Sequence, residues 1–311
     1  MTFVKAPYYE SRFVRANDPD GVRALWLRET LLLPDEGDPT ADVWVMAFDP
    51  SGHRAVKQRY AIDDADFDDD PWTARIASTL LDDAAASGTL PAARWDLAIV
   101  PNGAEPVRVL TERAYQRRFP TAKTTVRHPR ARFDGRLEIA GHRVDVDGWV
   151  GSVNHNWGTR HTPAYAYGQV CGFDNAPEST LEIVTARAAL GPVLLPGATL
   201  FVFRHDGQEF AVRTIRGSLQ SHGRYEPFTW TFGARVGEQM IEGEITTVPA
   251  DVIGLTYPDT HGGVKYCYNS AIASCRLQVA GKAFDRTELT SHRAMFEILT
   301  DTRLGAVPLL V

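Results

Sequence analysis

Apolar and polar side chains alternate with a period of two along most of this 311-residue chain. This period is typical of β-strands with one buried face, and Gly, Pro, Asn and Asp separate the alternating segments as they do in antiparallel sheets. The predicted strands are Ala24–Leu33, Val43–Phe48, Arg54–Ala61, Trp95–Val100, Arg136–Ile139, Arg143–Val146, Tyr165–Phe173, Leu181–Ala186, Ala198–Arg204, Glu209–Ile215, Phe228–Val236, Met240–Val248, Ser270–Val279 and Ala283–Leu289.

One stretch of the chain predicts a helix rather than a strand. Between Pro71 and Ala86, apolar side chains recur at a spacing of four residues, at Trp72, Ile76, Leu80 and Ala84. That spacing is typical of the buried side of an amphipathic helix. The sequence therefore predicts an all-β fold with one helix inserted in its first half.

Two segments far apart in the chain have similar sequences. Leu137–Val144 and Leu277–Phe284 each predict a strand, an Ala-Gly turn and a second strand. A further hairpin is predicted earlier in each half, over Val43–Tyr60 and over Thr199–Ile215. The repetition favours two β-rich halves, each a small antiparallel barrel, and the alternative is chance recurrence of a common turn.

The predicted boundary between the halves lies near Ala189–Val193, where Gly and Pro interrupt the alternation. This gives an N-terminal barrel over residues 1–188 and a C-terminal barrel over residues 189–311. A small barrel either fills with its own side chains or encloses one apolar ligand. Strand faces that mix aromatic and polar residues favour a ligand, held in or between the barrels.

Charge and composition narrow the class of partner. The net charge is −6 and the isoelectric point about 5.9, whereas proteins that bind nucleic acid or anionic membranes present a basic face. Hydrophobic residues make up 44% of the chain, enough for a substantial core. We therefore expect a hydrophobic small-molecule partner and no nucleic-acid partner, and the oligomeric state stays open.

The cysteines and the termini predict a cytoplasmic protein. The three cysteines, an odd number without metal-ligand spacing, are typical of a reducing compartment and predict no metal site. The N-terminal residues lack the apolar core of a signal peptide, and no apolar run reaches the ~20 residues of a membrane-spanning helix. The apolar tail Gly305–Val311 is too short to cross a bilayer, which leaves peripheral membrane contact open.

Polar groups of several kinds cluster in one part of the chain. The stretches Gly148–Gly158 and Tyr165–Asp174 place six of them among aromatic residues and glycines, namely Asn154, His155, Asn156, Tyr167, Gln169 and Asp174. Alternation puts four side chains on one strand face, those of Tyr165, Tyr167, Gln169 and Cys171. Two phenols, an amide and a thiol make a poor packing surface, so this face predicts the wall of a pocket.

The motifs of this region resemble those of a known group of proteins. Asn156-Trp157-Gly158, followed by Tyr165-Ala-Tyr167-Gly-Gln169, resembles the Asn-Trp-Gly and aromatic-x-aromatic-x-Gln signature of the AttH-like, carotenoid 1,2-hydratase and tocopherol cyclase group. Further resemblances, to the group's N-terminal strands and to a later strand, occur at Trp26-Leu-Arg28, Trp44, Phe48 and Tyr266–Ser270. The resemblance spans most of the chain and implies two lipocalin-like barrels.

The same resemblance implies an activity. The group includes enzymes that hydrate or cyclise isoprenoids without a redox cofactor, so we expect no cofactor. His155 and Trp157 match the His-x-Trp pair implicated in the carotenoid hydratases. No Tyr-x-Asp pair occurs at a matching distance, so the expected reaction is the hydration, cyclisation or isomerisation of an isoprenoid or natural product rather than carotenoid hydration in particular.

Adding water to an alkene, or closing a ring across one, begins with a proton from a positioned acid. His155 can titrate near neutral pH, and Asp174 is the nearest carboxyl after the motif if burial raises its pKa. These two are the predicted catalytic residues. The alternative for His155 is a structural role in a turn.

The remaining residues of the cluster are predicted to bind substrate. Aromatic faces stabilise a carbocation, a role predicted for Trp157, Tyr165 and Tyr167. Amide groups orient water or hold a hydroxyl, a role predicted for Asn154, Asn156 and Gln169. The alternatives are a core tryptophan and asparagines that cap a turn.

Two substrate-binding residues are predicted outside the cluster. Arg28 shares a strand face with Trp26 and Thr30, and an arginine that points inward needs a partner or an anionic ligand. The alternative is a solvent-facing arginine. Tyr266 belongs to the later strand that resembles the group.

Three classes of function fit these observations. The leading hypothesis is a cofactor-independent hydratase, cyclase or isomerase acting on a hydrophobic isoprenoid or natural product. The alternative is a non-catalytic carrier of an apolar small molecule, whose pocket needs no titratable group. A purely structural protein would have filled barrels and no cavity.

Overall fold

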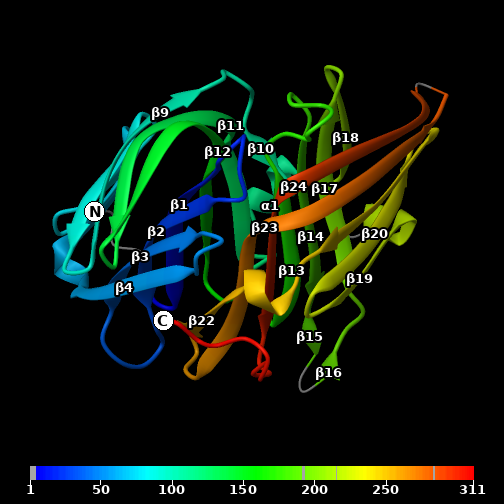
Figure 1. Cartoon of the computed structure of the whole chain (residues 1–311). Helices are drawn as coiled ribbons and strands as arrows, with labels where there is room; N and C mark the ends of the chain where they lie inside the picture. Colours follow the sequence, from blue (N-terminus) through cyan, green and yellow to red (C-terminus); the bar gives the residue numbers. More distant parts are fainter. Residues whose placement is uncertain (1–4, 191–192, 215, 283) are drawn as a thin grey trace.

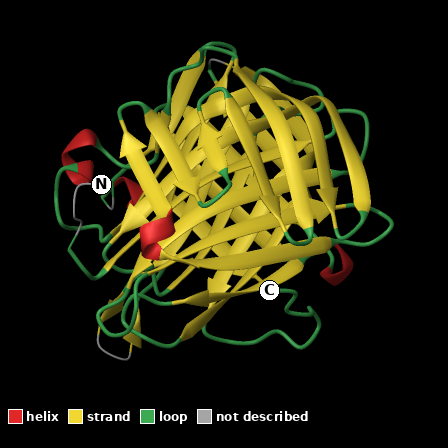
Figure 2. Cartoon of the chain, turned by 90° about the vertical axis from the view of Figure 1, so that its left-hand side faces the viewer, coloured by secondary structure: helices red, strands yellow, loops and turns green. Residues whose placement is uncertain are grey.

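The computed structural model describes residues 5–190, 193–214, 216–282 and 284–311, and the chain is almost entirely β. Its strands form two nearly closed antiparallel barrels, the first at the left of Figure 1 and the second at the right. Figure 2 looks onto the first barrel and shows strands of successive layers crossing one another. The predicted all-β fold with two barrels is confirmed.

Within the described residues, the first barrel is a twelve-stranded sheet with the order β4-β3-β2-β1-β12-β11-β9-β8-β7-β6-β5, in which β10 also pairs with β11. Its strands are β1 (Tyr8–Asn17), β2 (Ala24–Leu33), β3 (Thr40–Phe48), β4 (Arg54–Ala61), β5 (Ala65–Asp69), β6 (Trp72–Ile76), β7 (Leu80–Asp82), β8 (Ala85–Leu90), β9 (Ala93–Pro101), β10 (Val107–Arg108), β11 (Ala122–Ile139) and β12 (His142–Gly158). Two short helical pieces interrupt them, η1 (Ile62–Asp64) and α1 (Glu112–Tyr115).

The second barrel, over the same described ranges, is a ten-stranded sheet with the order β18-β17-β14-β13-β24-β23-β21-β20-β19, in which β22 also pairs with β23. Its strands are β13 (Ala164–Val170), β14 (Thr180–Arg187), β17 (Ala198–His205), β18 (Gln208–Val212), β19 (Ser221–Glu226), β20 (Thr229–Val236), β21 (Gln239–Thr246), β22 (Ile253–Pro258), β23 (Val264–Gly281) and β24 (Phe284–Thr300). Between β14 and β17 in the chain, β15 (Ala189–Leu190) and β16 (Val193–Leu194) form a separate two-stranded sheet. Two 3-10 turns follow, η2 (Gly217–Gln220) before β19 and η3 (Pro249–Asp251) before β22.

The two barrels repeat one strand order. In each sheet the first four strands are neighbours and lie in reverse chain order from one edge. The first strand then pairs with the last one, β1 with β12 and β13 with β24. The hairpin β11–β12 corresponds to β23–β24, and both have strands of 17 or 18 residues. The similar segments Leu137–Val144 and Leu277–Phe284 fall at the tips of these hairpins, although residue 283 lies outside the described residues.

The sheets divide the chain earlier than the predicted boundary at 188/189. Sheet membership changes between Gly158 and Ala164, so β13 and β14 belong to the second barrel, although the sequence prediction placed them in the first. The Gly-Pro stretch that suggested a boundary separates β14 from β17, two strands that pair directly, and residues 191–192 lie outside the described residues. A connection between two strands of one sheet can have the same composition as a linker between domains.

The predicted helix over Pro71–Ala86 is wrong, because this stretch forms β6, β7 and the start of β8. In β6 burial alternates, with Trp72, Ala74 and Ile76 buried and Arg75 exposed. A spacing of four residues is a multiple of two, so it also fits one face of a strand. The helical pieces are much shorter, and none of the described helices has the length and apolar composition that crossing a membrane requires.

Apolar side chains fill both barrels. Phe133 and Trp149 are at most 2% exposed inside the first, and Phe203 and Trp230 are fully buried inside the second. A third apolar cluster joins the outer faces of the barrels and includes Phe13, Trp26, Trp44, Leu255, Tyr257 and Cys267. Because the interiors are packed, the surface between the barrels is where a ligand finds room.

Candidate functional site

A cavity of about 470 Å³ lies between the two barrels. The first barrel contributes residues of β1, β2 and β12, and the second contributes residues of β13, β14, β17, β22 and β24. The segment between residues 109 and 124, which carries α1 near the centre of Figure 1, forms a further wall. Aromatic rings are frequent in the lining, at Tyr9, Phe13, Trp26, Phe119, Tyr165, Tyr167 and Tyr257. Size and lining are typical of a site for one small molecule.

The alternation of β13 explains why its phenols reach this cavity. Gly168 faces the second barrel's core, where a Cβ atom would lie 2.6 Å from the Ile245 side chain and 3.0 Å from Trp230. Its neighbours in the strand therefore face the opposite way, out of the barrel. Tyr165 and Tyr167 line the cavity as a result.

A buried arginine forms one polar group of the cavity. Arg28 Nη1 donates a hydrogen bond to the Tyr257 hydroxyl at 2.5 Å, and Nη2 donates to Ser11 Oγ at 2.7 Å. Arg28 is 7% exposed, and its Nε has no partner among the described residues. A buried guanidinium held by neutral hydroxyls retains most of its charge for a ligand that carries or develops negative charge.

A buried carboxyl forms the second polar group. The Tyr165 hydroxyl donates to Glu297 Oε1 at 2.5 Å, and Asn269 Nδ2 donates to Glu297 Oε2 at 2.9 Å. Both oxygens of Glu297 are thereby fixed in direction. Burial, followed by the charge of Glu297, raises the pKa of Tyr165 well above its usual value, so this phenol keeps its proton at neutral pH.

A histidine forms the third polar group. The His161 ring stacks on Tyr9 with 4.0 Å between the ring centroids, and its Nδ1 lies 3.5 Å from Asp259 Oδ1. Burial lowers the pKa of His161. Burial opposes ionisation of Asp259, but His161 and Lys265 outweigh it and hold the Asp259 pKa at about 2. Within the described ranges, no three His, Cys, Asp or Glu side chains gather as metal ligands do.

A buried polar seam (Arg15, Ser152, Asn154, Gln169 and Glu182) joins the barrels beside the cavity. Gln169 Oε1 accepts from Arg15 Nε at 2.7 Å and from Ser152 Oγ at 2.8 Å. Gln169 Nε2 lies 2.9 Å from both Asn154 Oδ1 and Glu182 Oε2 and donates to them. One amide from β13 thus contacts residues of β1, β12 and β14, which fixes the position of one barrel against the other.

Glu182 carries an unusual charge state for a carboxyl group. Burial raises its pKa to about 8, because the loss of hydration outweighs the contributions of Tyr167, Gln169 and Arg15. Glu182 is therefore mostly protonated at neutral pH. The neighbouring Tyr167, whose ring lines the cavity, also has a raised pKa, through burial and then the carboxyl of Glu182.

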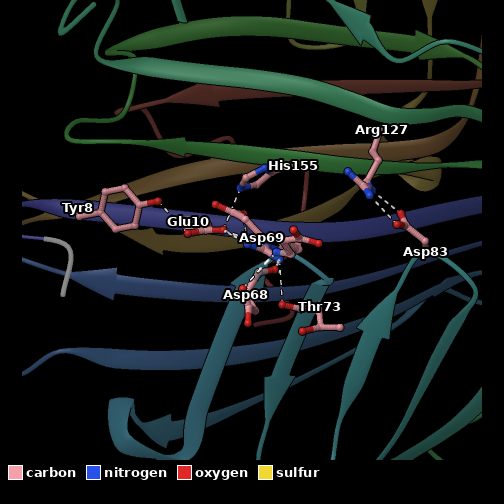
Figure 3. A network of polar contacts seen from close by, with 10 residues as sticks. Tyr8, Glu10, Asp68, Asp69, Thr73, Asp83, Arg127 and His155 are labelled. Carbon is pink, nitrogen blue, oxygen red and sulfur yellow. Dashed lines mark hydrogen bonds and ion pairs between the residues drawn. The ribbon is translucent and has the colours of Figure 1, made fainter. Parts of the chain in front are cut away.

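His155 lies in a different environment from the cavity. Its Nε2 is 2.9 Å from Glu10 Oε1, and its ring stacks on Trp157 with 4.4 Å between the ring centroids. Figure 3 shows His155, Tyr8 and Glu10 at one end of a network that continues through Asp69. The fully buried Arg12 connects them, because it donates to Glu10 Oε1 and to Asp69 Oδ1, at 2.9 and 2.8 Å.

This network predicts a loss of stability in acid. Burial would raise the pKa of Glu10, but His155, Arg12 and Tyr8 outweigh it and lower that pKa from 4.5 to about 2. The ionised Glu10 therefore stabilises the fold above pH 4.5, and this stabilisation is lost as pH falls toward 2. We expect Glu10→Gln to lower the free energy of unfolding at pH 6 by roughly 2 kcal/mol and to flatten its decline in acid. Urea denaturation across this pH range measures both, and an unchanged decline would contradict the assignment.

The structure brings some of the predicted site residues together and leaves others outside. Four line the cavity, namely Arg28, Asn156, Tyr165 and Tyr167, and Asn154 and Gln169 belong to the polar seam next to it. The other four lie neither in the cavity lining nor in the seam, namely His155, Trp157, Asp174 and Tyr266. Asp174 is exposed and accepts a hydrogen bond from Arg293 Nη2 at 2.5 Å. Tyr266 packs beside a small cluster around Val252 and Tyr268.

The lining residues that the sequence prediction missed include Tyr257, His161 and Glu297. Glu297 lies in an otherwise apolar run, Ala294–Leu299, and an acidic residue in such a run was an available signal. The predicted strand ends at Leu289, whereas β24 continues through this run to Thr300. His161 follows the Asn-Trp-Gly motif closely, and that proximity was the available signal for it.

Comparison with known proteins gives relatives at low sequence identity. Two Mycobacterium tuberculosis proteins, MT0513 of strain CDC 1551 and Rv0493c of strain H37Rv, both described as uncharacterized, are 25% identical to this chain over 271 residues. The match covers 87% of this chain and 80% of each relative. No family model matches the chain.

Three solved structures share the architecture. An AttH-like protein from Nitrosomonas europaea is 12% identical, with a TM-score of 0.59 over 96% of this chain and 93% of its own. Kievitone hydratase from Nectria haematococca is 9% identical, with a TM-score of 0.53 over 95% and 89%. CghA is 10% identical, with a TM-score of 0.65 over 96% and 90%. The chain therefore has the two-barrel fold of AttH-like proteins, which is the fold that its motifs implied.

Proposed function

We propose that this chain is a cofactor-independent enzyme that hydrates, cyclises or isomerises a hydrophobic isoprenoid or natural product bound between the barrels. The observation that carries the proposal is the position of Glu297. It is the sole acidic residue among the described residues that line the cavity, and Tyr165 and Asn269 hold both of its oxygens. A single oriented carboxyl in an aromatic cavity is suited to proton transfer.

Hydration of an alkene conjugated to a carbonyl illustrates the division of roles. Glu297 accepts a proton from a water molecule as the water oxygen bonds to the alkene carbon. Arg28 and Tyr257 donate hydrogen bonds to the carbonyl oxygen, which gains negative charge as the enolate forms. The proton then passes from Glu297 to the neighbouring carbon, so one water has been added and the carboxylate is restored.

One protein of the same fold supports this proposal. It is described as kievitone hydratase, and this chain shares its fold at 9% identity. Cyclisation or isomerisation uses the same residues without water, since a proton leaves one carbon and returns to another. The aromatic lining of the cavity favours substrates with delocalised or developing positive charge as well.

The test uses labelled solvent, because the substrate is not identified. Purified protein is incubated with a panel of prenylated phenols, terpenoid alkenes and conjugated enones in heavy-oxygen water, and separately in deuterated water. Hydration is expected to add one labelled oxygen, and cyclisation or isomerisation to add deuterium at carbon without any other change of formula. Mass spectrometry of the products distinguishes hydration from cyclisation and isomerisation.

A carrier would behave differently in the same experiment. It would bind panel members, as a change in tryptophan fluorescence shows, but it would return every one unlabelled. That result, together with an apolar compound that co-purifies unchanged, would contradict the enzymatic proposal and support a non-catalytic carrier.

A further inference from the structure

The opening of the cavity is basic. Six arginine and lysine side chains line the cavity. Arg28 is buried, and Arg213 is paired with Glu209 at 2.7 Å. The other four are exposed or half-buried and mark where the cavity meets solvent, and we call them the basic rim (Arg113, Arg117, Lys123 and Arg187). Arg113 and Arg117 lie in and just after α1, Lys123 begins β11 and Arg187 ends β14. Both barrels and the segment between them therefore contribute charge to one opening.

The charge of the basic rim is not neutralised by the protein. Across the described residues, none of its four members forms a salt bridge. Lys123 Nζ donates to the Tyr115 and Arg117 carbonyls, at 2.6 and 2.8 Å, and Arg187 Nε donates to the Leu195 carbonyl at 3.1 Å. The neighbouring carboxyl of Glu112 is paired with Arg108 at 2.6 Å.

The positive charge of the basic rim contrasts with the negative net charge of the whole chain. The net charge is −6, and acidic residues outnumber basic ones by 39 to 33. In the cavity lining the balance is reversed, since Glu297 is the one acidic member among the described residues. Uncompensated cations around an apolar cavity raise the local concentration of anions and orient them as they enter.

We propose that the ligand of this cavity is an amphipathic anion, with an apolar body held among the aromatic rings and a carboxylate or phosphate at the basic rim. Beyond the rim, Leu110, Val184 and Leu200 line the interior together with the aromatic residues, and Arg28 and Glu297 are its charged side chains. The inference deepens the proposed function and rests on its choice of cavity. It places the anionic group at the opening, away from the carboxyl of Glu297.

The first experiment compares probes that share one alkyl chain and differ in charge. Isothermal titration calorimetry below the critical micelle concentration measures the affinity for laurate, lauryl phosphate and dodecyltrimethylammonium. We expect both anions to bind at least about tenfold more tightly than the cation, and the preference to weaken as salt is added. The tighter of the two anions identifies the head group as carboxylate or phosphate.

The second experiment removes charge from the rim. The triple variant Arg113→Gln, Arg117→Gln, Arg187→Gln is expected to bind laurate roughly tenfold more weakly than the natural chain. The matched control is Arg94→Gln, Arg136→Gln, Arg235→Gln, which removes three exposed arginines outside the cavity and lowers the net charge equally. The control is expected to retain the affinity for laurate.

The outcomes separate this inference from the proposed function. Equal affinity for laurate and dodecyltrimethylammonium, or equal losses in the rim variant and its control, would overturn the amphipathic anion, even if neutral alkenes were turned over. Selective binding of the anions, reduced by the rim variant, would support it even if no labelled product formed, in which case the enzymatic proposal alone would fall.

Discussion

Replacing Glu297 with glutamine is expected to abolish turnover while the protein stays folded and keeps its cavity. Glutamine has nearly the shape of glutamate, and its carbonyl oxygen still accepts the hydrogen bond from Tyr165. It has no carboxylate to accept a proton from water or from carbon. General acid–base catalysis contributes about 10²- to 10⁴-fold, so we expect kcat to fall at least about a hundredfold. The rate of label incorporation from heavy-oxygen or deuterated water is the measurement.

The matched control is Glu288→Gln, which removes a carboxylate from the same strand, β24. Glu288 is exposed and its partner is Arg276, at 3.1 Å. Turnover of this variant should equal that of the natural chain. Tyr165→Phe is expected to have an intermediate rate, because it leaves the carboxylate in place but removes one of the two bonds that orient it. Full activity in Glu297→Gln would remove this residue from the mechanism.

The second large effect is expected at Gln169, and it concerns stability. Gln169→Leu removes the amide that four members of the polar seam share, and it leaves Arg15 Nε and the Ser152 hydroxyl buried without their acceptor. Breaking a buried network that holds a charge costs about 3 kcal/mol or more. We therefore expect a loss of roughly 3 kcal/mol in the free energy of unfolding, measured from the urea midpoint.

The control for this prediction is Gln220→Leu, because Gln220 is exposed on η2 and is expected to change stability by less than about 0.5 kcal/mol. Gln169→Leu is also expected to weaken laurate binding, since the seam fixes the two walls of the cavity relative to each other. A Gln169→Leu protein as stable as the natural chain would show that the barrels are held together by the apolar cluster around Trp26 and Tyr257 alone.

The strands that the sequence predicted best follow clear turn residues, Asp-Pro-Asp-Gly before β2 and Asp-Pro-Ser-Gly before β4. The predicted bounds of β2 and β4 agree with those of the structure. The helix over Pro71–Ala86 failed because its apolar spacing fits both periods, and β24 was predicted too short because its second half, from Ser291 onward, loses clean alternation. Both errors arise where the local pattern does not distinguish between structures.

The candidate site could likewise be predicted only in the part that depends on the local pattern of one strand. Alternation alone places Tyr165, Tyr167 and Gln169 on one face of β13, and the chemistry of those side chains marks that face as a pocket wall. Alternation does not reveal what covers the face. His155 and Asn156 are adjacent on β12, yet Asn156 lines the cavity and His155 joins the network of Glu10, because neighbours in a strand point to opposite sides of the sheet.

The β architecture, its repetition in two halves and the polar face of one strand could be predicted from the sequence, because they depend on period two and on turn residues close together in the chain. That the outer faces of two packed barrels enclose the cavity follows only from the folded arrangement. The same arrangement brings Arg28 of β2, Tyr257 of β22 and Glu297 of β24 to one place. Their separation along the chain leaves no local pattern, since only the pairing and closure of the sheets determine which distant strands meet.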